Sequence, residues 1–351
     1  MTEIKIIIPM AGIGKRMGQL TRHRPKALVR LADKRLLDHV LNIFEVLEKT
    51  YLVEYIFIVG YLGEQIREYM KRAHPDKHVT YFVQEQLMGQ SHAVYLAKDE
   101  ISGPIFLTYC DTINETDFSF LPLRTAEGVA FVQEVADPRR HGVAVIGPDN
   151  LLVKLVEKPQ TMEYRSVLTG LYYFSEGRDL IKGIETQMRE RMSLNNEYYL
   201  ADAINILLDD GMRIGSEKAL QWHDAGTPEA ILQTNAYLLQ SQSESHNELA
   251  RGHSNVLIPP LYLHESSRVE NSIIGPNVSI GENCVIKGSI IKNAIIDDNC
   301  NVTDAMLANS LIGGSCSVTG NPVQSTLGDY DGIRIHCTTD EMNGANCDQD
   351  S

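Results

Sequence analysis

Apolar residues along the first 240 positions follow two spacings. Stretches dominated by apolar residues, typical of buried strands, occupy residues 6–8, 55–60, 79–84, 105–111, 128–135, 143–146 and 169–174. In other stretches an apolar residue recurs every three or four positions, as on one face of a helix, at residues 36–47, 62–72, 92–98 and 228–239. This alternation predicts an α/β fold, in which a mostly parallel sheet carries helices on both faces.

The pattern changes toward the carboxyl end. From Ile274 to Val318 an aliphatic residue returns every five or six positions. Two series keep an interval of 16 residues: Ile280, Ile296 and Ile312, and Cys284, Cys300 and Cys316. So short a repeat predicts a parallel β-helix of about three coils, with the aliphatic side chains pointing inward. We interpret the cysteines as small hydrophobic residues of the same interior, rather than as metal ligands or disulfides.

A polar stretch, Ser241–Glu248, separates the two patterns and predicts an exposed connector. We therefore expect four segments: a first domain at 1–240, a linker at 241–253, a β-helix domain at 254–335, and a disordered tail at 336–351.

Composition narrows the class of protein. The chain has 351 residues, 43% of them hydrophobic, and a formal net charge of −14. Such a negative charge argues against nonspecific nucleic-acid binding, which needs Lys and Arg to neutralise phosphates. No apolar run is long enough to span a bilayer, and the first residues show no leader, so we expect a cytoplasmic protein. The six cysteines include no Cys-x-x-Cys pair, so neither a zinc site nor a redox pair is indicated.

The first strand runs into a loop with candidate phosphate chemistry. Gly12 and Gly14 are followed by two cations, Lys15 and Arg16, and then by Lys26. Backbone N–H groups of a glycine-bearing loop can bind a polyphosphate, and the cations would add charge and donors. The loop fits neither the Walker A pattern nor the dinucleotide-binding pattern of three glycines.

Several segments together carry a resemblance. They are Ala11-Gly12-Ile13-Gly14-Lys15-Arg16, Arg24-Pro25-Lys26-Ala27-Leu28, Gln84 with Gly89 and His92, Asp137–Val143, Glu157-Lys158-Pro159, Thr169–Phe174 and Trp222–Pro228. In this order they resemble the motifs of sugar-1-phosphate nucleotidylyltransferases, such as glucose-1-phosphate uridylyltransferases and thymidylyltransferases. The chain departs from these motifs at Ala11, Lys15 and His141, where the family has glycine, threonine and tyrosine. The resemblance implies a Rossmann-like, mostly parallel mixed sheet followed by a short left-handed β-helix.

The resemblance also implies roles for the matching residues. They are Arg16 and Lys26 in catalysis at the triphosphate, Ala11, Gly12, Gly14, Gln84 and Gly89 in nucleotide binding, Gly142, Glu157, Lys158 and Gly170 in sugar-phosphate binding, and Asp111 and Asp224 in binding Mg²⁺. The side-chain chemistry agrees with these roles. A glutamine amide can pair with the N3–H and a carbonyl of uracil or thymine. Mg²⁺ prefers oxygen ligands such as carboxylates and phosphates.

Some of these positions also have a structural explanation. Asp111 can cap a turn, and Glu157 with Lys158 can form an ion pair at a strand end. Asn195 with Glu197 resembles a helix start, with an Asn N-cap and a carboxylate in the first turn. Thr227 followed by proline makes a good entry to the last predicted helix.

The implied reaction is Mg²⁺-dependent transfer of a nucleotidyl group from UTP or dTTP to a sugar 1-phosphate, giving an NDP-sugar and pyrophosphate. Glucose 1-phosphate is the family's usual acceptor, but the residues decide neither the nucleotide nor the sugar. The expected partners are these two small molecules, without nucleic acid or membrane, and an exposed β-helix end would allow a homo-oligomer. Two alternatives stay open: an added acetyltransferase activity of the β-helix, and a non-catalytic relative that binds nucleotide sugars and regulates a partner.

Overall fold

The computed structural model of this chain describes residues 2–119, 121, 126–193, 196–241, 254–320, 326–330 and 332–334. It contains two compact units, residues 1–234 and 235–351, and the division falls inside helix α6 (Pro228–Ser241). The predicted linker beyond Ser241 and the predicted tail at 336–351 lie outside the described residues, so the predicted domain limits stay a prediction. In the described part of the chain no helix has both the length and the apolar character needed to span a membrane.

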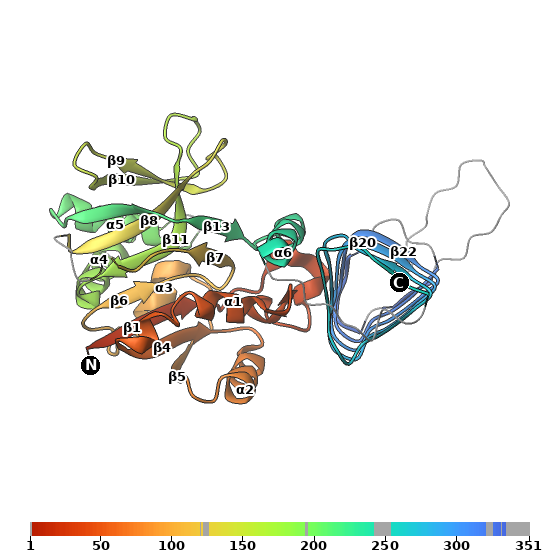
Figure 1. The fold of residues 1–351 in the computed structure, drawn as a ribbon. Coiled ribbons are helices and arrows are strands. Elements are labelled where there is room, and N and C mark those ends of the chain that lie inside the picture. Colours follow the sequence, from red (N-terminus) through yellow and green to blue (C-terminus); the bar gives the residue numbers. More distant parts are fainter. Residues whose placement is uncertain are drawn as a thin grey trace. The chain divides into compact units, whose positions relative to one another are not determined.

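The first unit is built on a mixed sheet (Figure 1). Its strands lie in the order β10-β9-β11-β6-β1-β4-β5, with β8 beside β11 and β12 beside β8. Their bounds are β1 (Glu3–Pro9), β4 (Leu52–Val59), β5 (His78–Val83), β6 (Ile105–Leu107), β8 (Gly128–Glu134), β9 (Gly142–Ile146), β10 (Leu152–Glu157), β11 (Ser166–Phe174) and β12 (Ile214–Lys218). Strand β1 is parallel to β4 and β6, whereas β11 is antiparallel to β6, β8 and β9. This arrangement confirms the predicted α/β fold.

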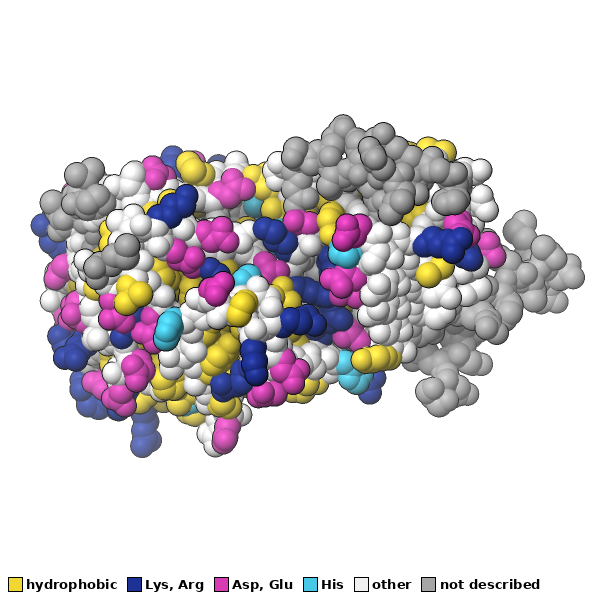
Figure 2. Space-filling view, turned by 60° about the horizontal axis from the view of Figure 1, so that its bottom comes forward, with side chains coloured by type: hydrophobic (Ala, Val, Ile, Leu, Met, Phe, Trp, Pro, Cys, Tyr) yellow, Lys and Arg dark blue, Asp and Glu magenta, His cyan; other side chains and the backbone are white. Residues whose placement is uncertain are grey.

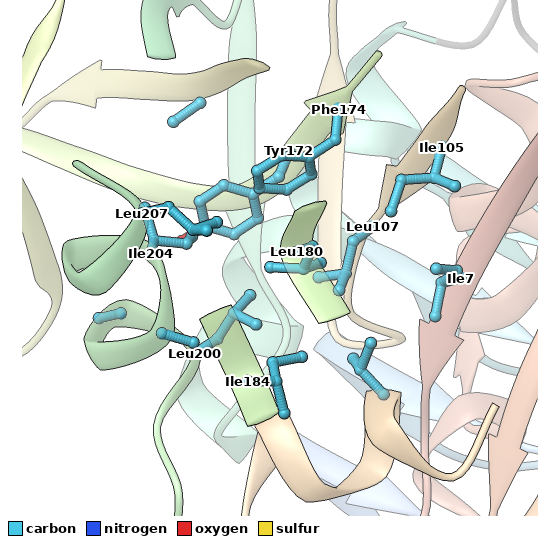
Figure 3. Packing of buried hydrophobic residues seen from close by; sticks show 14 of the residues in the cluster. Ile7, Ile105, Leu107, Tyr172, Phe174, Leu180, Ile184, Leu200, Ile204 and Leu207 are labelled. Atoms are coloured by element: carbon cyan, nitrogen blue, oxygen red, sulfur yellow. The ribbon is translucent and has the colours of Figure 1, made fainter. Parts of the chain in front are cut away.

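Helices cover both faces of this sheet. Successive residues of a strand point to opposite sides, so the apolar central strands present apolar side chains on both faces. In β1, Ile6 packs in a cluster with α1 and α2, whereas Ile7 packs in a cluster with α3, α4 and α5. Figure 3 shows the second cluster, in which Ile7 and Tyr172 come from strands and Leu180 and Ile204 from helices. The helices are α1 (Leu36–Asn42), α2 (Gly63–Ala73), α3 (Gln90–Tyr95), α4 (Gly177–Arg189) and α5 (Leu200–Asp209). The shorter elements are η1 (Lys15–Thr21), η2 (Lys26–Leu28), β2 (Arg30–Leu31), β3 (Lys34–Arg35), η3 (Leu47–Lys49), β7 (Thr112–Glu115) and β13 (Gln221–Asp224).

The chain differs from prediction where it leaves the sheet. The strand predicted to end at Asp111 ends at Leu107, because the residues after Asp111 pair antiparallel with β13 as strand β7. The helix predicted over 36–47 already ends at Asn42. Helix α5 begins at Leu200, so Glu197 is not in its first turn as predicted. The intervening Tyr198 is held by backbone hydrogen bonds to Met88 and Ser91 instead.

The second unit contains a three-sided coil of parallel strands, which Figure 1 shows end-on. The strands are β14 (Val256–Leu257), β15 (Leu261–Leu263), β16 (Arg268–Glu270), β17 (Ile273–Ile274), β18 (Val278–Ile280), β19 (Val285–Lys287), β20 (Ile290–Ile296), β21 (Asn301–Thr303), β22 (Met306–Ile312), β23 (Ser317–Thr319), β24 (Thr326–Leu327) and β25 (Gly332–Arg334). Ile280, Ile296 and Ile312 lie in register and are almost wholly buried. The predicted parallel coil is therefore confirmed, whereas its left-handed sense stays a prediction.

The three repeated cysteines are buried free thiols. Each Sγ donates to a backbone carbonyl about one coil further on: Cys284 to Asp297 at 3.0 Å, Cys300 to Gly313 at 3.0 Å, and Cys316 to Gly328 at 2.7 Å. They act as small interior residues with one satisfied polar group, in agreement with the sequence interpretation.

Figure 2 shows one face of the molecule, on which basic and acidic side chains are interspersed rather than segregated.

Candidate active site

A cavity of about 1080 Å³ opens in the first unit. Its walls include residues that directly follow β1 and β6, together with parts of the β9–β10 hairpin, β11 and the start of α6. In open α/β sheets ligands bind beyond the carboxyl ends of the parallel strands, which is where the residues after β1 and β6 lie. Most of the predicted site residues line it: Gly12, Gly14, Arg16, Lys26, Asp111, Gly142, Glu157, Lys158, Gly170 and Asp224. The other three, Ala11, Gln84 and Gly89, are not among its lining residues.

The three small residues of the loop after β1 have different surroundings. A Cβ on Gly12 would have no atom within 4 Å, so the backbone here is open to a ligand. Gly14 has a φ of +72° and faces Thr21, which suits a tight turn into η1. Ala11 is buried and packs against Gly60. A Cβ added to Gly60 would lie 2.7 Å from the carbonyl oxygen of Ala11 and 2.9 Å from its Cβ, so this contact needs a glycine at position 60. The departure at Ala11 is thus matched by a glycine on the neighbouring strand end.

Lys26 and Asp111 form the central ion pair of the site. The Nζ atom of Lys26 donates to Oδ2 of Asp111 at 2.6 Å, and the Lys26 side chain is 9% exposed. Burial alone would raise the pKa of Asp111. The charge and hydrogen bond of Lys26, with the charge of Arg16, outweigh burial and hold this pKa below its ordinary value. Asp111 is therefore ionised in the folded protein at neutral pH.

Asp224, which comes late in the sequence of the first unit, lies close to Asp111. It is the register partner of Thr112, and the N–H of Ala225 donates to the Asp111 carbonyl at 2.8 Å. Burial and the negative charge of Asp111 raise the pKa of Asp224. A Cβ on Gly226 would lie 2.7 Å from Oδ1 of Asp224 and 3.0 Å from Nη2 of Arg16, so Arg16 also extends to this point.

The two carboxylates fit a hard divalent cation. They are like charges in a partly buried place, where burial and then the charge of Asp111 raise the pKa of Asp224. Within the described residues no group of three or more His, Cys, Asp and Glu is placed to hold a metal alone. Two carboxylates are the kind of donor that Mg²⁺ takes from a protein when phosphate oxygens and water complete its shell, so Asp111 and Asp224 could hold this ion.

Another part of the cavity lining carries the predicted sugar-phosphate residues. Gly142 and Glu157 are register partners in the β9–β10 hairpin, and a Cβ on Gly142 would lie 3.1 Å from Oε2 of Glu157. Lys158 is held in a left-handed conformation, φ 45°, and its N–H donates to the His141 carbonyl at 3.1 Å. Gly170 has a φ of +81° and leaves room for the Tyr109 ring.

Sequence reasoning missed several residues of this cavity: Gln90, Arg140, His141, Glu197, Tyr199 and Trp222. The ring of His141 stands edge-on to that of Trp222, with 5.2 Å between centroids. Burial lowers the pKa of His141, although the charges of Asp224 and Glu157 act in the opposite direction. The available signal was the quoted motifs themselves, since His141 and Trp222 both lie within them.

Gln84 and Gly89 are engaged with protein groups. Gln84 is 5% exposed, and its Nε2 donates to the Gly89 carbonyl at 3.1 Å. A Cβ on Gly89 would come within 2.5 Å of the Tyr198 nitrogen and 2.6 Å of its carbonyl oxygen. The glycine is therefore required by a neighbouring backbone, and its predicted contact with a base stays a prediction.

A sheet with this cavity and this cluster of cations and carboxylates defines a class of phosphate-handling α/β enzymes. The family described as nucleotidyl transferase matches residues 5–241 of the chain, and the GMPPB C-terminal domain matches residues 257–326. The chain belongs to the sugar-1-phosphate nucleotidylyltransferase family.

Individual relatives agree with this membership. The chain is 31% identical over 239 residues to the bifunctional protein GlmU of Methanococcus vannielii, a match that covers 67% of this chain and 55% of the relative. It is 26% identical over 317 residues to a glucose-1-phosphate thymidylyltransferase of Streptomyces antibioticus, covering 83% and 86%. A solved UDP-glucose pyrophosphorylase complexed with UDP-glucose aligns with a TM-score of 0.58 at 18% identity, covering 69% of this chain and all of that one. The chain thus spans little more than half the length of the GlmU relative and shares the fold of the solved enzyme.

Proposed function

We propose that this protein transfers a nucleotidyl group from a nucleoside triphosphate to a sugar 1-phosphate. An oxygen of the sugar phosphate attacks the α-phosphorus, the bond from that phosphorus to the β-phosphate oxygen breaks, and pyrophosphate leaves with the electron pair. The products are an NDP-sugar and pyrophosphate. Because this reaction needs no covalent enzyme intermediate, catalysis consists of positioning and charge stabilisation.

The observation that carries the proposal is the convergence of Arg16, Lys26, Asp111 and Asp224 at one side of the cavity. Arg16 and Lys26 would bind the triphosphate and stabilise charge that develops on its oxygens during transfer. Asp111 and Asp224 would hold Mg²⁺, which when bound supplies further positive charge to phosphate oxygens. The open backbone at Gly12 would donate hydrogen bonds to the same phosphates.

The predicted sugar-phosphate residues of the cavity lining would hold the acceptor sugar. Glu157, with its side chain 36% exposed, would accept hydrogen bonds from sugar hydroxyls. Lys158 lies beside it, with Nζ 3.7 Å from Oε1 of Glu157, and would attract the sugar phosphate. Gly142 and Gly170 allow the Glu157 side chain and the Tyr109 ring to pack against the backbone of this lining, which would border the sugar ring.

The name of the thymidylyltransferase relative and the amide of Gln84 favour a pyrimidine nucleotide with a ring N–H, UTP or dTTP, and glucose 1-phosphate as acceptor. A panel of UTP, dTTP, CTP, ATP and GTP, each with glucose 1-phosphate or N-acetylglucosamine 1-phosphate and Mg²⁺, tests this. Pyrophosphate release that requires both substrates, with an NDP-sugar found by chromatography, is expected. Pyrophosphate release without a sugar phosphate, or no release with any pair, would contradict the proposal.

A further inference from the structure

The amide of Gln84 has a fixed orientation. Its nitrogen, Nε2, lies 3.1 Å from the carbonyl oxygen of Gly89. A backbone carbonyl can only accept a hydrogen bond, so the –NH₂ group, and not the amide oxygen, must face Gly89. Oε1 therefore points away from this contact.

His92 reinforces the same orientation. Its Nδ1 atom lies 3.0 Å from the same Nε2 of Gln84. Because both protons of the –NH₂ group point outward from Nε2, Nδ1 must offer a lone pair, and the ring proton must sit on its other nitrogen. Burial lowers the pKa of His92, which favours this neutral form.

This arrangement leaves one polar group of Gln84 available. Among the described residues Oε1 has no hydrogen-bond partner, and Gln84 as a whole is only 5% exposed. With both protons of Nε2 already engaged, the side chain can offer an incoming base an acceptor but not a donor.

We propose that His92 is a positioning residue, which together with the Gly89 carbonyl locks the Gln84 amide so that its oxygen meets the base. This inference rests on the proposed function and on base binding beside Gln84. A locked acceptor selects bases that carry a ring N–H at the contacted edge, such as uracil and thymine, whose N3–H can donate. It rejects cytosine, whose N3 is itself an acceptor and would leave Oε1 desolvated and unpaired.

Two substitutions at His92 separate the hydrogen bond from ring packing. His92→Leu removes the acceptor, whereas His92→Asn can place Oδ1 where Nδ1 stands. In His92→Leu we expect the KM for UTP and its Kd by calorimetry with Mg²⁺ to rise about three- to tenfold, the range expected for one neutral hydrogen bond. CTP binding and kcat should change little, so the preference for UTP over CTP narrows. His92→Asn should restore most of that preference.

The inference is overturned if folded His92→Leu keeps the wild-type UTP-to-CTP ratio, or if His92→Asn loses as much as His92→Leu. Nitrogen NMR of histidine-labelled wild-type protein gives a test that needs no stable variant, because the His92 ring should carry its proton on Nε2, and a proton on Nδ1 refutes the lock. If the wild-type enzyme is active and His92→Leu keeps the wild-type preference for UTP over CTP, only the inference about His92 is refuted. A wild type that releases no pyrophosphate would defeat the proposed function, while calorimetry with UTP and CTP would still decide the role of His92.

Discussion

The Nζ atom of Lys26 lies 2.6 Å from Oδ2 of Asp111, a residue 85 positions further along the chain. This contact joins the 3₁₀ turn η2 to the segment where the chain leaves the main sheet after β6. The cation and the carboxylate at this side of the cavity therefore act as one electrostatic unit, in which Lys26 holds the pKa of Asp111 below its ordinary value.

Replacing Lys26 by alanine should lower kcat about a hundredfold or more, because a charge that stabilises the transition state would be lost. The loss should also leave Asp111 without the cation that lowers its pKa. Steady-state pyrophosphate release measures the effect. Lys182→Ala is the matched control, since Lys182 also pairs with an aspartate at 2.7 Å but its side chain is 71% exposed on α4. Near-normal turnover in Lys26→Ala would refute the assignment.

Replacing Asp224 by asparagine should stabilise the metal-free protein while it lowers activity at least a hundredfold. Burial and Asp111 raise the folded-state pKa of Asp224 above its unfolded value. The ionised carboxylate therefore costs stability at pH values above that raised pKa, and the cost disappears as the pH falls through it. Asparagine keeps an oxygen for the Gly226 N–H, 2.7 Å away, and removes the charge.

Thermal unfolding in the presence of a metal chelator, which keeps the protein metal-free, tests this change in stability. At pH 7.5 the Asp224→Asn variant should melt a few degrees above the wild type, and the difference should shrink at pH 4.5. A variant less stable than the wild type at pH 7.5 would show that the two carboxylates do not repel each other as inferred.

Replacing Gly89 by alanine should destabilise the protein by about 2–4 kcal/mol, because its backbone conformation, φ 94° and ψ −178°, is strained for any other residue and the new Cβ overpacks. The new Cβ would press on the Tyr198 backbone, at 2.5 and 2.6 Å, and disturb its hydrogen bonds to Met88 and Ser91. Gly103→Ala is the control, because Gly103 also has a positive φ, +68°, but has no atom within 4 Å of the added Cβ. The denaturant midpoints of the two variants give the loss of stability in each. Equal losses would mean that the Tyr198 backbone moves aside at little energetic cost.

Replacing Asp38 by asparagine should cost about 1.5–3 kcal/mol of stability at neutral pH, the usual value for a hydrogen bond to a charged group. His74 Nε2 and the Tyr69 hydroxyl each donate to this carboxylate at 2.7 Å, and the Arg35 N–H donates at 2.8 Å. Burial would raise the pKa of Asp38, but these donors together lower it below its ordinary value. A lowered carboxyl pKa gives stability that is complete above the unfolded-state pKa and is lost as the pH falls through the folded-state value. The wild-type advantage over Asp38→Asn should thus be full at pH 7 and shrink below about pH 4, as measured by thermal unfolding across this range.

The sequence predicted much of this site because strand ends and motifs are local features. The resemblance assigns Lys26 and Asp111, and both lie in segments that follow buried strands, which parallel pairing brings to one edge of the sheet. Asp224 was assigned from its motif, and its actual position depends on the antiparallel pairing of β13 with β7, a nonlocal register that no spacing in the chain reveals.

Other features depended on tertiary contacts and could not be predicted. Glu197 looked like part of a helix start, but backbone pairing of Tyr198 with the segment around Gly89 keeps it extended at the cavity wall. The orientation of Gln84 depends on His92, eight positions further on and on the next helix. Residue propensity and hydrophobic periodicity predict where the helices and strands lie. They do not predict which polar atoms come into contact in the folded protein.

One coil of the second unit carries an extra residue at a bend. Ile274 pairs with Ile291, 17 residues later, while Ile291 pairs with Leu307 after 16, yet all three side chains stay inside. Since Ile280 and Ile296 are again 16 apart, the surplus residue is absorbed in the bend after Ile274. Insertions and deletions are thus expected to be accepted there or as whole turns, whereas a one-residue slip within a strand would exchange its interior and exterior side chains.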